Sequence, residues 1–196
     1  FYCGYNRYSQ GYKLYKLLSF MPYQLRQIIS NNVGKLNPTF LSKIDYSLSN
    51  NIKLSGFQDK IMKLSQVLDV NEKNKFYQKL ISCINEPSQF LIYGSEPETL
   101  ISNHFSWPKT DDFRELMMYL DAKTYLVDDI LTKVDRAAMG VSLETRVPFL
   151  DHRLVEFAWG LPQSMKLRDG KSKWALRQVL YRHVPKALIE RPKMGF

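Results

Sequence analysis

The sequence predicts a mainly α-helical protein, because apolar residues recur at helical spacing and no run of several strands is present. The 196 residues are 44% hydrophobic and 13% aromatic, which is enough to form a core and too much for intrinsic disorder. No apolar run approaches the roughly 18 residues that a membrane span requires. No basic and apolar leader opens the chain, so we expect a cytoplasmic protein without a secretory signal or membrane partner.

Four helices are predicted in the first half of the chain. An apolar stripe over 12–21 ends at Pro22, and a second helix is expected over 23–32. Helical spacing continues in two further segments, at Phe57, Ile61, Leu64 and Leu68 and at Phe76, Leu80 and Ile84. The regular spacing within each segment predicts one buried helix face.

The clearest apolar stripe runs in steps of three and four residues from Phe113 to Ala138. The polar residues 110–112 before it are typical of a helix N-terminus. We expect a break near 124–127, with Asp128-Asp129 beginning a second helix, because adjacent acids suit a first turn better than a helix interior.

The pattern changes after Gly140. Residues 141–147 alternate and precede Pro148, so we expect them to be extended. Asp151 is expected to cap a short helix, and Gly170 to separate a loop from the last good helix. In the capped helix, the residues expected to face inward are Leu154, Val155 and Ala158.

The net charge of +9 is concentrated near the end of the chain. Residues 166–196 hold nine basic and two acidic residues, so 1–165 carry only +2. Such a field suits a phosphate-bearing ligand, a nucleic acid or simply a solvated face.

No metal site of the chain's own is predicted. Cys3 and Cys83 lie far apart, and the histidines form no metal-binding pattern, so we expect two free thiols. Asp128, Asp129 and Asp135 lack the spacing of a magnesium loop. A helix start and a surface pair between Asp135 and Arg136 account for them.

Three groups of residues are candidates for a site. Lys193 lies on a loop between Pro192 and Gly195, where it either neutralises a phosphoryl or pyrophosphate group or is a surface lysine in a turn. Lys173 and Arg177, four apart on the last helix, share a face that either binds an anion or is solvated. The third group is Glu144, Arg146 and Asp151, which either form a buried acid–arginine pair that fixes the extended turn or take part in catalysis; we expect the pair.

The order of these segments resembles the synthetase domain of glutamine-dependent asparagine synthetase. Residues 123–151, 170–177 and 190–196 follow the family's motifs in order, and the region 119–196 is dense in them. The opening residues 1–8 resemble the segment that directly follows the family's acidic, glycine-rich loop for pyrophosphate and magnesium. The resemblance therefore implies that 1–196 is the C-terminal half of a synthetase domain.

The resemblance also implies a fold and an activity. The fold would be the helical C-terminal portion of an α/β ATP-pyrophosphatase domain, without its nucleotide-binding sheet. The complete enzyme would use ATP and Mg²⁺ to adenylate aspartate, which releases pyrophosphate. Ammonia would then attack the aspartyl-adenylate and release AMP. That ammonia would come from glutamine through an N-terminal glutaminase domain absent from this chain. The ligands for the metal and for adenine would also lie outside it.

Residue roles follow from the same resemblance. Lys193 would be catalytic, holding the ATP phosphates and the leaving pyrophosphate, and Lys173 would be a neighbouring phosphate contact. Tyr5 would line the cleft. The family's Glu-x-Arg-x-Pro-Phe-Leu-Asp motif, which contains Glu144, Arg146 and Asp151, would be scaffold beneath the active site.

Two departures limit the expected activity. The sequence contains no Ser-Gly-Gly-x-Asp-Ser nucleotide loop, and the acidic loop would end just before Phe1. We therefore expect the isolated chain to be inactive. Two alternatives stay open: a related amidotransferase acting on another carboxylate, such as a sugar acid, and a basic helical nucleic-acid-binding module at 166–193.

Overall fold

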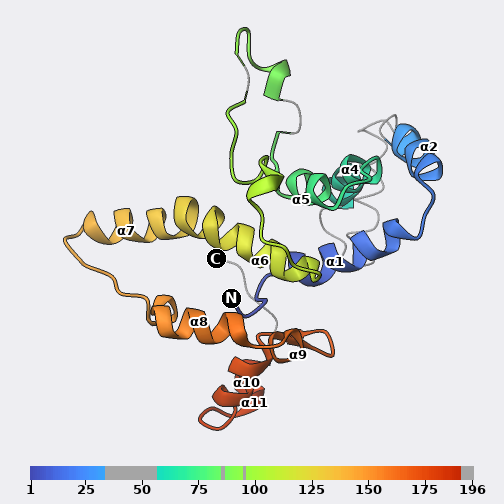
Figure 1. The fold of residues 1–196 in the computed structure, drawn as a ribbon. Coiled ribbons are helices and arrows are strands. Elements are labelled where there is room, and N and C mark those ends of the chain that lie inside the picture. The colour runs from blue at the N-terminus through green and yellow to red at the C-terminus, as the bar shows by residue number, and fades with distance from the viewer. Residues whose placement is uncertain (34–56, 85–86, 95, 191–196) are drawn as a thin grey trace. The chain divides into compact units, whose positions relative to one another are not determined.

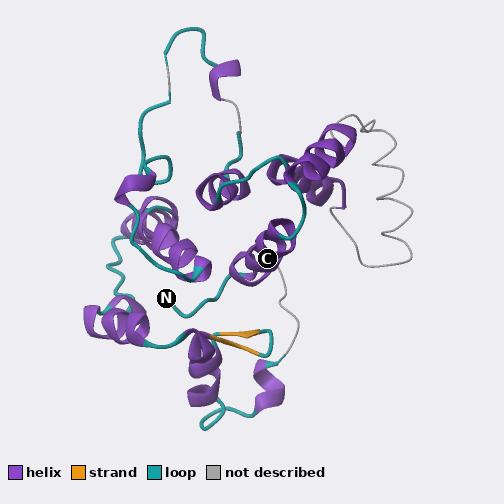
Figure 2. Cartoon of the chain, turned by 45° about the vertical axis from the view of Figure 1, so that its right-hand side comes forward, coloured by secondary structure: helices purple, strands orange, loops and turns teal. Residues whose placement is uncertain are grey.

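The computed structural model describes residues 1–33, 57–84, 87–94 and 96–190, and these residues are mainly helical, as predicted (Figure 1). The chain divides into two compact units, one of residues 1–10 and 110–196 and the other of residues 11–109. In the described residues, the strands amount to one two-stranded hairpin, drawn in orange in Figure 2. None of the described helices has the length and apolar character needed to cross a membrane.

The second unit, residues 11–109, contains most of α1 and three further helices. They are α1 (Asn6–Ser19), α2 (Tyr23–Val33), α4 (Phe57–Leu68) and α5 (Lys73–Ile81). Short 3₁₀ turns follow at Pro87–Gln89 and His104–Ser106. Helix α4 packs against α2 and α5. The predicted bounds of α2 and α4 are confirmed to within a residue, whereas Ile84 lies beyond the end of α5.

Apolar side chains from α1, α4 and α5 form the core of this unit. Leu18, Val67 and Phe76 are buried, and the rings of Tyr15 and Phe76 meet edge to face with their centres 5.4 Å apart. The predicted buried face of α4 is confirmed at Leu68, which is 3% exposed, whereas Ile61 and Leu64 are only half-buried. The Phe57 side chain lies outside the described part of the structure.

In the first unit, α6 (Phe113–Lys123), a π-helical segment (Tyr125–Leu131) and α7 (Thr132–Met139) follow one another. The expected break lies at Thr124, whose backbone leaves helical geometry (φ −121°, ψ −80°). The second helix does not begin at Asp128-Asp129, however, because the π-helical turn has already started at Tyr125 and takes up the extra residue there.

The rest of the first unit consists of short elements. The prediction of an extended segment over 141–147 is wrong at its start, because Val141 and Ser142 continue from α7 as a turn, with Ser142 at positive φ. Residues 143–147 belong to no helix or strand. A 3₁₀ turn at Pro148–Leu150 leads to a run of short helices and strands: α8 (His152–Gly160), α9 (Gln163–Lys166), β1 (Leu167–Arg168), β2 (Lys171–Ser172), α10 (Trp174–Leu180) and α11 (Lys186–Ile189). The antiparallel strands are joined by Asp169-Gly170, both at positive φ, which is typical of a tight hairpin turn.

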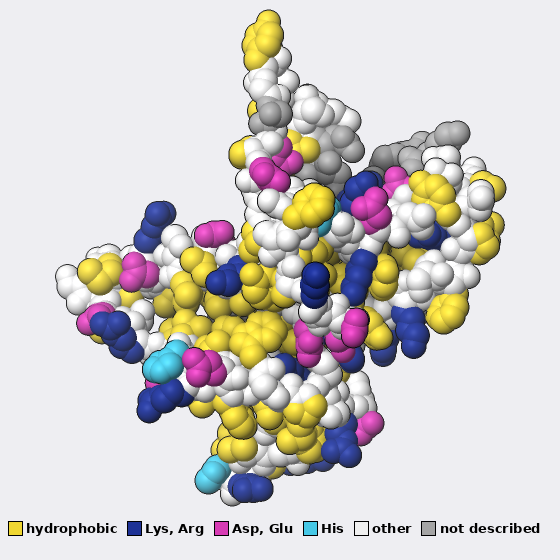
Figure 3. Space-filling model, in the orientation of Figure 1, with side chains coloured by type: hydrophobic (Ala, Val, Ile, Leu, Met, Phe, Trp, Pro, Cys, Tyr) yellow, Lys and Arg dark blue, Asp and Glu magenta, His cyan; other side chains and the backbone are white. Residues whose placement is uncertain are grey.

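Helix α6 supplies most of the core of the first unit. Its buried residues include Phe113, Leu116, Met117 and Leu120, in agreement with the predicted stripe. Beyond Thr124 the stripe is largely exposed, with Val127 and Val134 48% and 40% exposed, although Ala138 at its end is buried. On α8, Ala158 is buried as expected, but Leu154 is 40% exposed, because no described element covers that side of the helix. Figure 3 shows hydrophobic side chains gathered between α7 and α8.

Candidate functional site

The start of the chain lies against the segment that contains Lys173. The backbone N–H of Lys173 donates a 3.1 Å hydrogen bond to the carbonyl of Tyr2. A Cβ placed on Gly4 would lie 2.6 Å from Cε of Lys173, so only glycine lets the lysine side chain pass this closely. Two segments that resemble the family from opposite ends of the chain therefore meet in one unit.

Aromatic contacts strengthen this junction. Phe1 packs edge to face on Trp159 of α8, with ring centres 6.1 Å apart. Tyr2 packs in the same way on Phe149, at 6.2 Å. The segment 1–4 is thus held both by the backbone of Lys173 and by rings from the region that follows the extended turn.

Tyr5, the predicted cleft residue, lines a cavity of about 380 Å³. The cavity is mainly apolar, and its walls come from residues 1–8, α6, the π-helical segment and the turn after 147; they include Phe1, Tyr8, Met118, Tyr125, Leu131 and Phe149. The Arg7 guanidinium lies 4.9 Å from the ring centre of Tyr5 and 5.0 Å from that of Tyr125. These contacts place Tyr5 at the edge of a preformed hollow.

A buried polar cluster below Tyr5 joins α1 to α6. Asp121 on α6 is 5% exposed, and its Oδ2 accepts hydrogen bonds from the Tyr8 hydroxyl at 2.5 Å and from Arg7 Nε at 3.0 Å. Burial and the adjacent carboxylate raise the pKa of the Tyr8 phenol well above its usual value. The sequence does not predict this cluster, since no spacing pattern relates Arg7 and Tyr8 to Asp121.

The predicted Glu144–Arg146 ion pair exists, but it is exposed rather than buried. The side chains are 68% and 86% exposed, because the extended segment that carries them has no strand partner among the described residues. The pair therefore fixes the turn only weakly.

Asp151 pairs with Arg153 instead of Arg146, with 2.7 Å between Oδ2 and Nη2. Its side chain also accepts a hydrogen bond from the backbone N–H of Arg153, so it caps α8 as predicted. The side-chain and backbone hydrogen bonds from Arg153 lower the pKa of Asp151 to about 2. Arg146 and Asp151 both border a second, larger hollow of about 700 Å³.

The basic candidates do not share one helix face. Lys173 precedes α10 in the left-handed conformation (φ 55°), outside the helix, so its side chain is not aligned with that of Arg177. Arg177 donates to the carbonyl of Ser172 and to Glu190, each at 2.9 Å. Lys173 is thus the more available cation of the two. Lys193 lies outside the described residues, so its predicted role stays a prediction.

The acidic candidates Asp128, Asp129 and Asp135 lie in the π-helical segment and in α7. Asp129 forms an ion pair with Lys133, at 2.5 Å. Asp135 and Arg136 form no ion pair in the described structure, because neighbouring residues on a helix point in different directions. Within residues 1–33, 57–84, 87–94 and 96–190, no three His, Cys, Asp or Glu side chains gather as a metal site.

The fold and the site define a helical protein in which one available lysine lies against a glycine in the opening segment. Comparison with known families gives the class: the asparagine synthase model matches residues 1–196, so the chain belongs to the asparagine synthase family. No solved structure matches the chain.

Curated relatives carry names that agree with this family. The chain is 41% identical over 86 residues to asparagine synthetase (glutamine-hydrolysing) 3 of Bacillus subtilis, a match that covers 44% of this chain and 14% of the relative. It is 44% identical over 80 residues to a putative asparagine synthetase of Mycobacterium tuberculosis H37Rv, covering 41% and 12%. The human asparagine synthetase is 34% identical over 118 residues, covering 57% and 21%. The matches thus span a small part of each relative's length.

Proposed function

We propose that this chain is the C-terminal half of the synthetase domain of a cytoplasmic, glutamine-hydrolysing asparagine synthetase. The complete enzyme would convert aspartate to asparagine through an aspartyl-adenylate, releasing AMP and pyrophosphate, with ammonia drawn from glutamine by another domain. The fold of that domain would be of the α/β ATP-pyrophosphatase type, with this chain as its helical portion. Support comes from the family match over 1–196 and from the names of the relatives.

The observation that carries the proposal is the contact between Gly4 and Lys173. The opening residues resemble the segment next to a phosphate-binding loop, and Lys173 adds a positive charge beside them. A lysine ammonium on a fixed backbone stabilises the negative charge that develops on phosphate oxygens. In the proposed site, Lys173 therefore forms a cationic wall that faces the ATP phosphates, and the family resemblance implies Lys193 as the catalytic cation.

Tyr5 would border this wall from the side of the apolar cavity. Its ring is anchored by Arg7, which the Asp121 carboxylate in turn holds at 2.7 Å. A ring fixed in this way can exclude water from one side of a reacting group. In this proposal Tyr5 shapes the cleft, and Arg7 and Asp121 position it.

The described residues do not fit a magnesium ion. Among those residues, no three His, Cys, Asp or Glu side chains gather as a metal site. Two carboxylates of this unit are committed elsewhere, Asp121 to Arg7 and Tyr8 and Glu190 to Arg177 and Tyr181. Magnesium in such sites is bound by carboxylates together with substrate phosphates. We therefore assign to this chain the cationic contacts of ATP and leave the metal and adenine contacts to the rest of the proposed enzyme.

The test compares the isolated 196 residues with the full-length product of the same gene. The full-length protein is expected to form asparagine, AMP and pyrophosphate from aspartate, ATP and glutamine, and the isolated chain to form none. Product formation from a sugar acid but not from aspartate would favour the related amidotransferase. Tight, steeply salt-dependent binding of DNA or RNA by the isolated chain would favour the nucleic-acid-binding module.

A further inference from the structure

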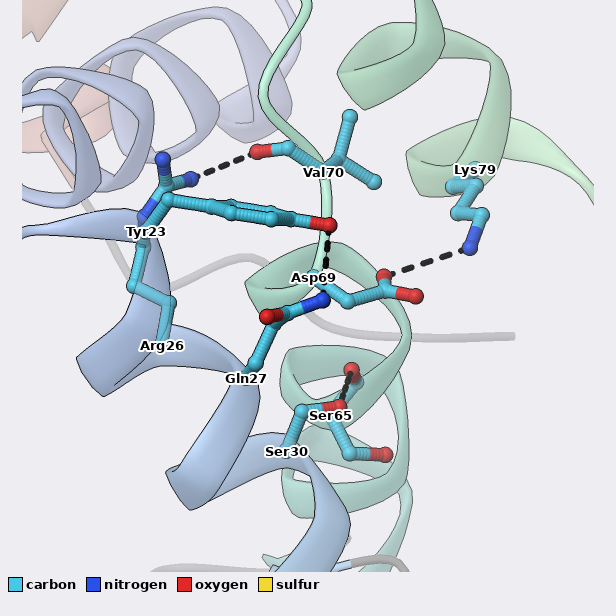
Figure 4. A network of polar contacts seen from close by, with 8 residues as sticks. All are labelled: Tyr23, Arg26, Gln27, Ser30, Ser65, Asp69, Val70 and Lys79. Carbon is cyan, nitrogen blue, oxygen red and sulfur yellow. Dashed lines mark hydrogen bonds and ion pairs between the residues drawn. The ribbon is translucent and has the colours of Figure 1, made fainter.

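Arg26 is a buried arginine in the unit of residues 11–109. It lies on α2 and is only 6% exposed. Its Nη1 donates to the carbonyl of Val70 at 2.5 Å, and its Nη2 to Oδ1 of Asn71 at 2.8 Å. Figure 4 shows the guanidinium beside the ring of Tyr23, whose centre is 5.5 Å from Cζ. All of these partners are neutral.

The acids beside Asn71 are directed to other cations. Asp69 pairs with Lys79 at 3.2 Å, as Figure 4 shows, and Glu72 pairs with Lys75 at 3.0 Å. No carboxylate pairs with Arg26 in the part of the chain that the structure describes, and its Nε is buried without a hydrogen-bond partner. A buried charge with only neutral partners is costly. Among the described residues, this guanidinium has no anion that would offset that cost.

A cavity of about 120 Å³ adjoins the guanidinium. Its walls include Arg26, Asn71, Ser19 and Tyr15, together with the buried side chains of Leu18 and Phe76. The volume exceeds the ~30 Å³ share of a single water in the liquid, so a compact polyatomic ion fits. Arg26, Asn71 and Ser19 bring polar side chains to the lining of this cavity, and Leu18, Val70 and Phe76 bring apolar ones.

We propose that this cavity is a binding site for a compact tetrahedral oxyanion of the inorganic phosphate or sulfate type, held by Arg26. Guanidinium groups bind such oxyanions through charge-assisted hydrogen bonds. The site lies within residues 11–109 and does not depend on the synthetase activity proposed above.

The test uses Asn71→Asp, which places a carboxylate 2.8 Å from Arg26 without changing the shape of the side chain. Thermal unfolding of the 196-residue chain is followed as inorganic phosphate replaces chloride at constant ionic strength, with sulfate in a parallel series. The wild-type Tm is expected to rise along a saturating curve, by roughly 3 °C at ten times the dissociation constant. The lower half-saturation concentration identifies the better of the two anions.

The Asn71→Asp variant is expected to have a higher Tm in chloride and to lose most of the phosphate response, because its own carboxylate takes the place of the anion. Asn31 is exposed on α2, the helix that carries Arg26. Asn31→Asp makes the same charge change away from the guanidinium and should respond like wild type. Non-specific stabilisation by phosphate would be equal in all three proteins. A wild type without a saturating response, or an Asn71→Asp variant that responds as strongly as wild type, would overturn the proposal.

Discussion

The Tyr8 hydroxyl donates a 2.5 Å hydrogen bond to Oδ2 of Asp121, a residue 113 positions further along the chain. The same carboxylate pairs with Arg7 at 2.7 Å. One buried side chain on α6 therefore fixes the end of the opening segment, while the backbone of Lys173 fixes Tyr2 near its start. The proposed phosphate-facing wall depends on both attachments.

Removing the Tyr8 hydroxyl tests the first attachment. Tyr8→Phe is expected to lower the free energy of unfolding by about 2 kcal/mol, because a hydrogen bond to a charged, buried acceptor is lost. Asp121→Ala is expected to cost about 3 kcal/mol, since Arg7 and Tyr8 both lose their partner. Urea unfolding measures each change. Tyr119→Phe, on α6 like Asp121, is the control and should change the free energy of unfolding by less than about 0.5 kcal/mol. Equal losses for Tyr8→Phe and Tyr119→Phe would refute the role assigned to the Tyr8–Asp121 hydrogen bond.

A methyl group on Gly4 tests the contact with Lys173. Gly4→Ala is expected to cost less than about 1 kcal/mol, because Cε belongs to the flexible end of the lysine side chain, which can move away from the new Cβ. In a Lys173→Ala background this cost should disappear, which a double-mutant cycle of unfolding free energies will show. Gly160→Ala, whose Cβ would meet nothing within 4 Å, should be neutral or stabilising. Additive effects of Gly4→Ala and Lys173→Ala would mean that the two residues do not interact.

At Lys173, we expect the requirements of stability and of the proposed function to conflict, because the backbone conformation favours glycine and the phosphate contact needs the lysine side chain. Its φ of 55° is unfavourable for a side chain with a Cβ. Lys173→Gly should therefore raise the unfolding free energy by about 1 kcal/mol while removing the proposed phosphate contact. Chemical denaturation checks the gain, and a loss of stability of similar size would show that the lysine side chain contributes more through packing than through charge.

Asp151 is expected to contribute to the free energy of unfolding in a way that depends on pH. Its pKa of about 2 in the folded chain lies below the ordinary value near 4, because Arg153 stabilises the ionised form. The stabilisation is therefore complete above pH 4 and is lost as the pH falls toward 2. Asp151→Asn keeps a capping side chain but removes the charge, so its unfolding free energy should fall less steeply than that of wild type between pH 4 and pH 2. Parallel slopes for the two proteins would contradict this assignment.

Local patterns in the sequence predicted the helices well. The bounds of α4 and the caps Asp112 and Asp151 follow from apolar spacing and capping chemistry, which act within a few residues. The hairpin turn at Asp169-Gly170 was missed, although an Asp-Gly pair is a known signal for it.

The arrangement of the site could not be predicted in the same way. The Tyr8–Asp121 bond and the contact of Lys173 with the opening segment join residues that no periodicity relates. The left-handed conformation of Lys173 follows from its tertiary contacts rather than its own propensity. The error over Glu144 and Arg146 has a related cause: their pairing was visible in the sequence, but their burial depends on what packs against them.

The most direct test of the account is aspartate-dependent exchange of pyrophosphate into ATP by the full-length protein, measured for wild type, Lys173→Ala and Lys171→Ala. Lys171 is an exposed lysine on the adjacent strand and is the matched control. We expect exchange to fall at least tenfold, about 1.4 kcal/mol, in Lys173→Ala and to stay near wild type in Lys171→Ala. Equal exchange rates in all three proteins would contradict a phosphate-facing role for Lys173.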